Sequence, residues 1–69
     1  MEFKWENGFK ISVRIECGQV VVSANREGLL SLANHLKALA EEEPGGHFHL
    51  DEYNSLEDNS VELTVEKAE

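Results

Sequence analysis

The stretch "NREGLLSLANHLKALAEEE", Asn25 to Glu43, has helical periodicity, and it decides the fold. Asn25 suits the N-cap, and a carboxylate in the first turn, Glu27, complements the helix dipole. The helix should stop near Glu43, because a proline and two glycines follow it. The spacing predicts one apolar stripe that covers a sheet, made of Leu29, Leu32, Ala33, Leu36, Leu39 and Ala40.

The residues before this helix alternate as strands do. In Glu2 to Glu16 the large apolar side chains occupy every second position on either side of a turn. A three-residue loop, Glu6 to Gly8, pairs Trp5 with Phe9 and keeps the large side chains on one face, with the glycine in a left-handed conformation. This turn joins the first two of three antiparallel strands that precede the helix.

The second reversal of this meander lies at Glu16 to Gln19. A two- or four-residue loop there sets Ile15 opposite Val20 and Val13 opposite Val22, which keeps one face of the sheet apolar.

Two more strands follow the helix, roughly His47 to Glu52 and Ser60 to Lys67, with a polar, turn-rich segment between them. The order is βββαββ, so we predict an α+β fold in which a single helix packs on one face of a mostly antiparallel sheet. A chain of 69 residues has room for one core, so residues 1–69 form a single small domain.

The charge is strongly acidic, with fourteen Asp and Glu against six Lys and Arg and a net charge of −8. This charge disfavours nucleic acids and anionic membranes and favours a basic protein partner. Cys17 is the only cysteine, which excludes an intramolecular disulfide and fits a reducing compartment. No run resembles a signal peptide or is long enough to cross a bilayer, so we expect a cytoplasmic protein.

The stretch "HFHLDEY", His47 to Tyr53, contains the residues most suggestive of chemistry. Its alternation directs Phe48 and Leu50 to the core and leaves His47, His49 and Asp51 on the opposite face. Side chains two apart on a strand are roughly 6.5 Å apart at Cα, so two imidazoles could bind one Zn²⁺ with a carboxylate as third ligand.

A solvated outer face or a protein-recognition surface explains the same residues, and both fit better than a metal site. Tyr53 suits an interface because it offers apolar area and a hydrogen-bonding group. The run Glu41, Glu42, Glu43 opposes the negative end of the helix dipole, an unfavourable arrangement that either frays the last turn or serves a basic partner. No catalytic constellation or cofactor site is recognisable, so we predict a protein that is not an enzyme and uses no cofactor.

Three pieces of sequence, "EGLLSLANHL", "GGHFHLD" and "NSVELTVEK", resemble the bacterial immunity protein family thirty-two of polymorphic toxin systems. The resemblance runs from about Gly18 to Lys67 and implies a cytoplasmic α+β protein that binds and neutralises a cognate toxin, usually encoded nearby. It identifies no contact residues.

The leading prediction is therefore a binding protein that occludes a basic toxin through an acidic surface. We place its contacts at Glu41, Glu42, Glu43, His47, His49, Asp51 and Tyr53. One alternative is a small metal-binding domain that uses His47, His49 and Asp51. The other is a structural or oligomeric accessory module, in which an exposed edge strand drives self-association.

Overall fold

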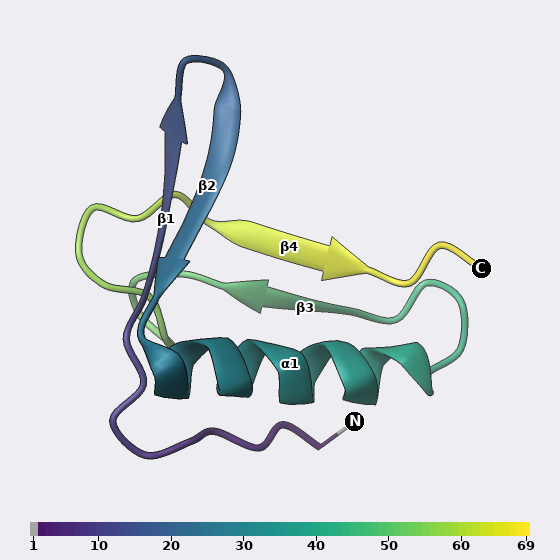
Figure 1. Cartoon of the computed structure of the whole chain (residues 1–69). Coiled ribbons are helices and arrows are strands. Elements are labelled where there is room, and N and C mark those ends of the chain that lie inside the picture. The colour runs from purple at the N-terminus through teal and green to yellow at the C-terminus, as the bar shows by residue number, and fades with distance from the viewer. Residues whose placement is uncertain (1) are drawn as a thin grey trace.

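The computed structural model describes residues 2–69, in which four strands and one helix follow the order ββαββ (Figure 1). The elements are β1 (Ile11–Glu16), β2 (Gln19–Ala24), α1 (Arg26–Ala40), β3 (His47–Leu50) and β4 (Leu63–Glu66). The predicted α+β class is confirmed. The predicted order and single sheet are wrong, because β1 pairs only with β2 and β3 only with β4, as two separate antiparallel sheets.

The predicted register of β1 and β2 is confirmed. Ile15 lies opposite Val20, and Val13 lies opposite Val22. The strands are joined through Cys17 and Gly18, whose φ angles are 49° and 78°. Two central residues with positive φ are typical of a type I′ turn, which matches the twist of a hairpin.

The segment before β1 makes the predicted turn but forms no strand. Phe9 N donates to Glu6 O at 3.2 Å, Gly8 has a φ of 85°, and the Trp5 and Phe9 rings stack at 4.4 Å. Glu6 N, however, donates to the Ser31 hydroxyl at 2.8 Å rather than to another strand. The segment therefore runs along α1, on the side away from β3 (Figure 1).

Asn25 is the N-cap of α1, as predicted, and it also holds the N-terminal segment. Its Oδ1 accepts from Gly28 N at 2.8 Å and from Lys10 N at 3.0 Å. Its Nδ2 donates to Gly8 O at 3.0 Å. One side chain thus satisfies the start of the helix and fixes the chain that leads into β1.

The buried face of α1 is rotated from the predicted apolar stripe. The helix buries Gly28, Ser31, His35 and Leu39. Leu29 and Leu36 from the predicted stripe are 55% and 50% exposed, whereas Leu39 is 4% exposed. Ser31 can occupy the buried face because its hydroxyl accepts from Glu6 N of the N-terminal segment.

His35 is fully buried among aromatic rings. It stacks on Phe3 at 4.4 Å between ring centroids and meets Trp5 edge-on at 4.2 Å. Its Nδ1 hydrogen-bonds the Ser31 carbonyl, and its Nε2 is buried with no hydrogen-bond partner among the described residues. Much of this ring's environment comes from outside the helix.

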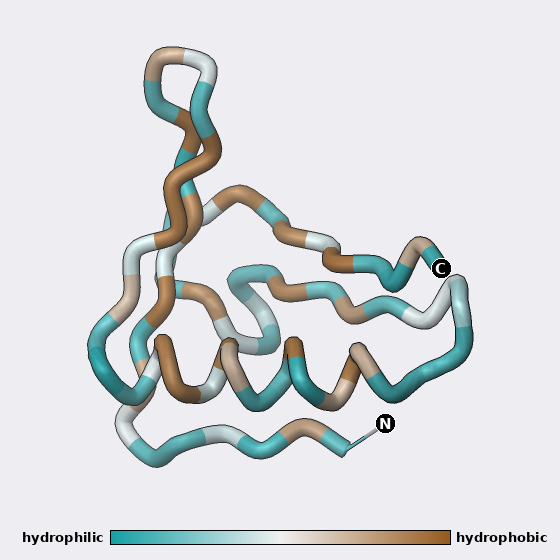
Figure 2. Tube along the Cα trace, turned by 45° about the vertical axis from the view of Figure 1, so that its right-hand side comes forward, coloured by the Kyte–Doolittle hydropathy of each residue, from teal (hydrophilic) through white to brown (hydrophobic). Residues whose placement is uncertain are grey.

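The core lies where β1, α1, β3 and the loop before β4 meet, and it contains Ile11, Val13, Leu39, Phe48, Leu50 and Leu56. The loop joins the two sheets along the outer edge of β1. Glu57 N donates to Ile11 O, and Val61 N donates to Val13 O, both at 2.8 Å. Beyond this joint the β1–β2 pair extends away from the body, and its apolar residues continue toward the tip (Figure 2).

Candidate functional site

The outward side of β3 and β4 carries the histidines that the sequence singled out. Phe48 and Leu50 are 4% and 3% exposed, whereas His47 and His49 are exposed, so the predicted orientation of β3 is confirmed. On the neighbouring strand, Glu66 lies opposite His47 and Thr64 opposite His49. We call His47, His49, Glu62, Thr64 and Glu66 the polar face.

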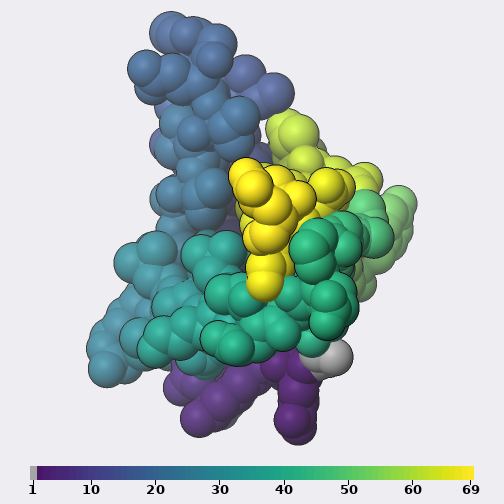
Figure 3. All heavy atoms as spheres, turned by 90° about the vertical axis from the view of Figure 1, so that its right-hand side faces the viewer, coloured from purple at the N-terminus to yellow at the C-terminus, as the bar shows by residue number. Residues whose placement is uncertain are grey.

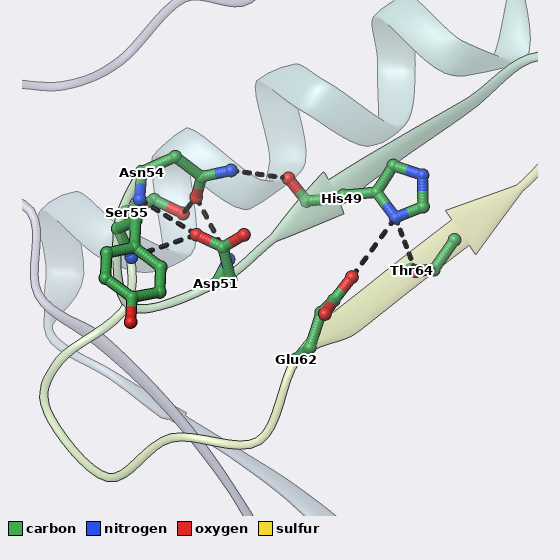
Figure 4. A network of polar contacts seen from close by, with 7 residues as sticks. His49, Asp51, Asn54, Ser55, Glu62 and Thr64 are labelled. Atoms are coloured by element: carbon green, nitrogen blue, oxygen red, sulfur yellow. Dashed lines mark hydrogen bonds and ion pairs between the residues drawn. The ribbon is translucent and has the colours of Figure 1, made fainter.

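His49 is held by two groups from the β4 side (Figure 4). Its Nδ1 lies 2.8 Å from the Thr64 hydroxyl and 3.4 Å from a carboxylate oxygen of Glu62. The His47 ring meets the His49 ring edge-on at 4.9 Å, and its Nδ1 lies 3.1 Å from Gly45 O. Because these side chains are exposed, their contacts orient the rings and contribute little to stability.

Asp51 does not join the histidines. Its carboxylate accepts from Tyr53 N at 2.9 Å and from Asn54 N at 3.0 Å, and its carbonyl accepts from Leu56 N at 2.8 Å. Asp51 is therefore the first residue of the turn after β3, and its carboxylate and carbonyl hold that turn together, as in an Asx turn. Figure 4 shows this turn beside β3, with the Asp51 carboxylate away from the His49 ring.

The three predicted metal ligands therefore do not converge. Within residues 2–69 no group of three or more His, Cys, Asp or Glu side chains is arranged to hold a metal ion. The two histidines are neighbours, but their Nδ1 atoms already have protein partners. The alternative of a metal-binding domain lacks its third ligand in this arrangement.

Tyr53 lies in the turn after β3 and is 99% exposed. The apolar area of its ring is therefore not buried within the fold. Aromatic rings that gain from burial are common contributors to protein interfaces.

The acidic run at the end of α1 has a compensating cation that sequence reasoning missed. Lys67 Nζ donates to Ala40 O at 2.8 Å and to Glu42 O at 2.7 Å, which satisfies carbonyl groups at the helix C-terminus. The backbone of Lys67 also pairs with Gly45 and Gly46 at 2.8 Å. The only sequence signal was a lysine just after the last strand.

The contacts of Lys67 bring the predicted acidic run and the predicted histidines of β3 to the same part of the surface. Glu41 is the C-cap of α1, and the run Glu41–Glu43 leads through a proline and two glycines into β3. Because Lys67 follows Glu66 directly, its bonds place the acidic run at the end of the polar face. We call the run Glu41–Glu43 together with the polar face the acidic end.

The described part of the chain encloses no detectable pocket. No helix in residues 2–69 is long and apolar enough to cross a bilayer. The acidic end is thus an open surface built from one helix terminus and two short strands.

One comparison with known proteins identifies a family. A family model described as immunity protein 32 matches residues 19–68, which include β2, α1, β3 and β4 in full. No curated protein and no solved structure matches the chain. Because the family model spans well over half of the sequence, the chain belongs to the immunity protein 32 family.

Proposed function

We propose that this chain binds a cognate bacterial toxin in the cytoplasm and neutralises it by covering the toxin's active surface. Membership of the immunity protein 32 family supports the class of function. The mechanism needs no chemistry from the chain itself, because a tightly bound protein excludes substrate by occupying the surface that the substrate needs.

The observation that carries the choice of surface is the gathering of exposed carboxylates at the acidic end. Glu41, Glu43, Glu62 and Glu66 are all exposed. Figure 3 shows the end of α1 (green) and the last residues of the chain (yellow) side by side on one face. Tyr53 supplies exposed aromatic area in the turn that follows β3.

A basic toxin is the partner that this surface suits. With a net charge of −8, the chain attracts a cation-rich protein over about a Debye length, roughly 8 Å at physiological salt. Attraction of this kind mainly raises the association rate and fixes the orientation of docking. Association should therefore slow as the salt concentration rises.

Co-expression with the toxin encoded by the adjacent gene tests the class of function. We expect the chain to restore growth and to co-purify with that toxin. Failure both to bind and to protect would refute the proposal.

Charge reversal tests the surface. Glu66→Lys and Glu2→Lys each change the net charge by the same amount at an exposed position. Glu66 is in β4, whereas Glu2 belongs to the N-terminal segment, which lies on the other side of α1 (Figure 1). We expect Glu66→Lys to reduce the association rate by about tenfold and to weaken its salt dependence, because it removes a local attraction. Glu2→Lys should have a several-fold smaller effect, since only the overall charge changes. Equal effects would place the toxin elsewhere on the chain.

A further inference from the structure

β2 has an unpaired outer edge. Val13 N donates to Ser60 Oγ at 3.1 Å and Val13 O accepts from Val61 N at 2.8 Å, so both groups point away from β2. Val13 and its partner Val22 are therefore a non-hydrogen-bonded pair, and the pattern alternates along the ladder. The N–H and C=O groups of Val20 and Val22 consequently point outward, and no group of residues 2–69 bonds to them.

This edge lacks the usual protection against pairing with another strand. β2, Gln19–Ala24, has six residues with no charge and no proline. By contrast, β4 has only four residues and ends in Glu66, and the outer edge of β1 is covered by the loop bonds at Ile11 and Val13. Short edge strands, charges and covering loops are the devices that prevent strand addition, and β2 has none of them.

Exposed apolar side chains accompany the free edge. Ile15, Val20 and Val22 share one face of the pair and are 60%, 63% and 39% exposed. The same face carries Ala24, which packs against α1 at Gly28. In Figure 3 the β1–β2 pair (blue) rises clear of the other segments toward its tip.

We propose that β2 pairs with β2 of a second copy of this chain, antiparallel, to form a four-stranded sheet across a two-fold axis. Outward-pointing residues must face one another for the ladder to continue. The register centred on Val21 satisfies this condition, because it sets Val20 of each copy opposite Val22 of the other. The exposed apolar faces of the two hairpins then form one surface, with valine against valine.

The chemistry of the edge favours a second copy over a basic toxin. From Gln19 to Asn25 there is no charged side chain that would select a cation-rich partner. The acidic end belongs to β3, β4 and the C-terminus of α1, whereas β2 leads into the N-terminus of α1. The strongest repulsion between two copies is therefore remote from the paired strands.

The available area indicates a weak dimer. Ile15, Val20 and Val22 are each between 39% and 63% exposed. At roughly 100 Å² for a side chain of this size, they offer on the order of 150 Å² per protomer. A standard interface buries about 800 Å² per partner, so main-chain pairing has to supply a large part of the contact.

Sedimentation velocity of the intact chain, from low micromolar to near-millimolar concentration, tests the pairing. We expect a reversible shift from monomer to dimer. Hydrogen exchange of the Val20 and Val22 amides should slow as the dimer forms, because those N–H groups become bonded. A monomer at every concentration, or amides that exchange at the same rate throughout, would overturn the proposal.

Two variants and a matched control locate the interface. Val20→Lys adds a charge at an exposed edge position, and Val22→Pro removes an outward N–H without touching the ladder to β1. Both should remain monomeric, with circular dichroism confirming the fold. Ser23→Lys adds the same charge on the other face of β2, at an exposed position whose backbone bonds toward β1, and should still dimerise.

The control also separates other occupants of the edge. Loss of the dimer in Ser23→Lys as well as in Val20→Lys would show a general charge effect rather than this interface. If the chain alone is monomeric and Val20→Lys instead loses affinity for the toxin, the edge belongs to a toxin strand and the second copy is excluded. Because sedimentation uses the chain alone, failure of the dimer leaves the toxin-binding proposal intact.

Discussion

Gly28→Ala should destabilise this protein. In an ordinary exposed helix, by contrast, replacing Gly with Ala stabilises the helix by about 1 kcal/mol. Gly28 is buried near the start of α1, where the helix meets β1 and β2. A Cβ at this position would lie 2.5 Å from Lys10 O, 2.9 Å from Ala24 Cβ and 3.0 Å from Ile11 Cγ1. The nearest of these atoms is backbone and cannot rotate away.

The size of the effect follows from two opposing terms. Overpacking of a close contact costs about 1–3 kcal/mol, and the upper part of that range applies because Lys10 O also accepts from Asn25 N at 3.1 Å. Moving that carbonyl disturbs the helix start. After the gain in helix propensity, we expect a net loss of about 1–2 kcal/mol in the free energy of unfolding, or roughly 5–15 °C in the midpoint.

Urea unfolding followed by far-ultraviolet circular dichroism measures this loss. Ala33→Gly, at an exposed position of the same helix, serves as the control and should lose about 0.5–1 kcal/mol from propensity alone. If Gly28→Ala is as stable as the parent chain or more stable, the close packing of α1 against Lys10 and Ala24 is refuted.

Substitutions at three further positions test contacts that hold α1. Asn25→Ala removes the acceptor for Gly28 N and Lys10 N, and urea unfolding should show a loss of about 1–2 kcal/mol. His35→Ala should lose about 2–4 kcal/mol in the same assay because it leaves a cavity. His35→Phe should lose much less, since the ring stacking remains and a buried unpartnered nitrogen disappears; equal losses would contradict this account. Lys67→Met removes two hydrogen bonds to the end of α1, so its last turn should exchange amide hydrogens several-fold faster, whereas unchanged exchange would show that the lysine is dispensable.

Local patterns in the sequence were sufficient to predict the parts of the fold that depend on neighbouring residues. The register of β1 and β2 followed from keeping Val13, Ile15, Val20 and Val22 on one face. The N-cap at Asn25 followed from side-chain chemistry. Each of these features is decided within a few residues of chain, where periodicity and turn chemistry act.

The parts that were mispredicted depend on distant partners. The N-terminal segment alternates like a strand, but its backbone bonds to Ser31 and its rings pack on His35, so it lies on the helix. The stripe through Leu29 and Leu36 suggested the wrong buried face, because the face of a helix that carries leucines is normally buried in preference to one that carries a serine and a histidine. The second sheet was merged with the first because a sequence does not show which strand edges meet.

The candidate site was predicted unevenly for the same reason. Alternation correctly separated Phe48 and Leu50 from the exposed histidines of β3. Asp51 fits the same alternation, but its carboxylate accepts hydrogen bonds from backbone amides of the turn after Leu50 and so does not lie with the histidines. The contact between Lys67 and the acidic run joins residues that are 25 positions apart in the sequence, so no local pattern predicts it.

The joint between the loop and β1 also bears on the order of folding. Val13 and Ser60 are 47 residues apart, so their contact closes a long loop, whereas the β1–β2 pair and α1 need only nearby residues. The hairpin and helix can therefore form early, and the loop should dock late and detach early on heating. Once it detaches, β1 gains an open edge in addition to that of β2, so irreversible aggregation should begin below the midpoint of global unfolding.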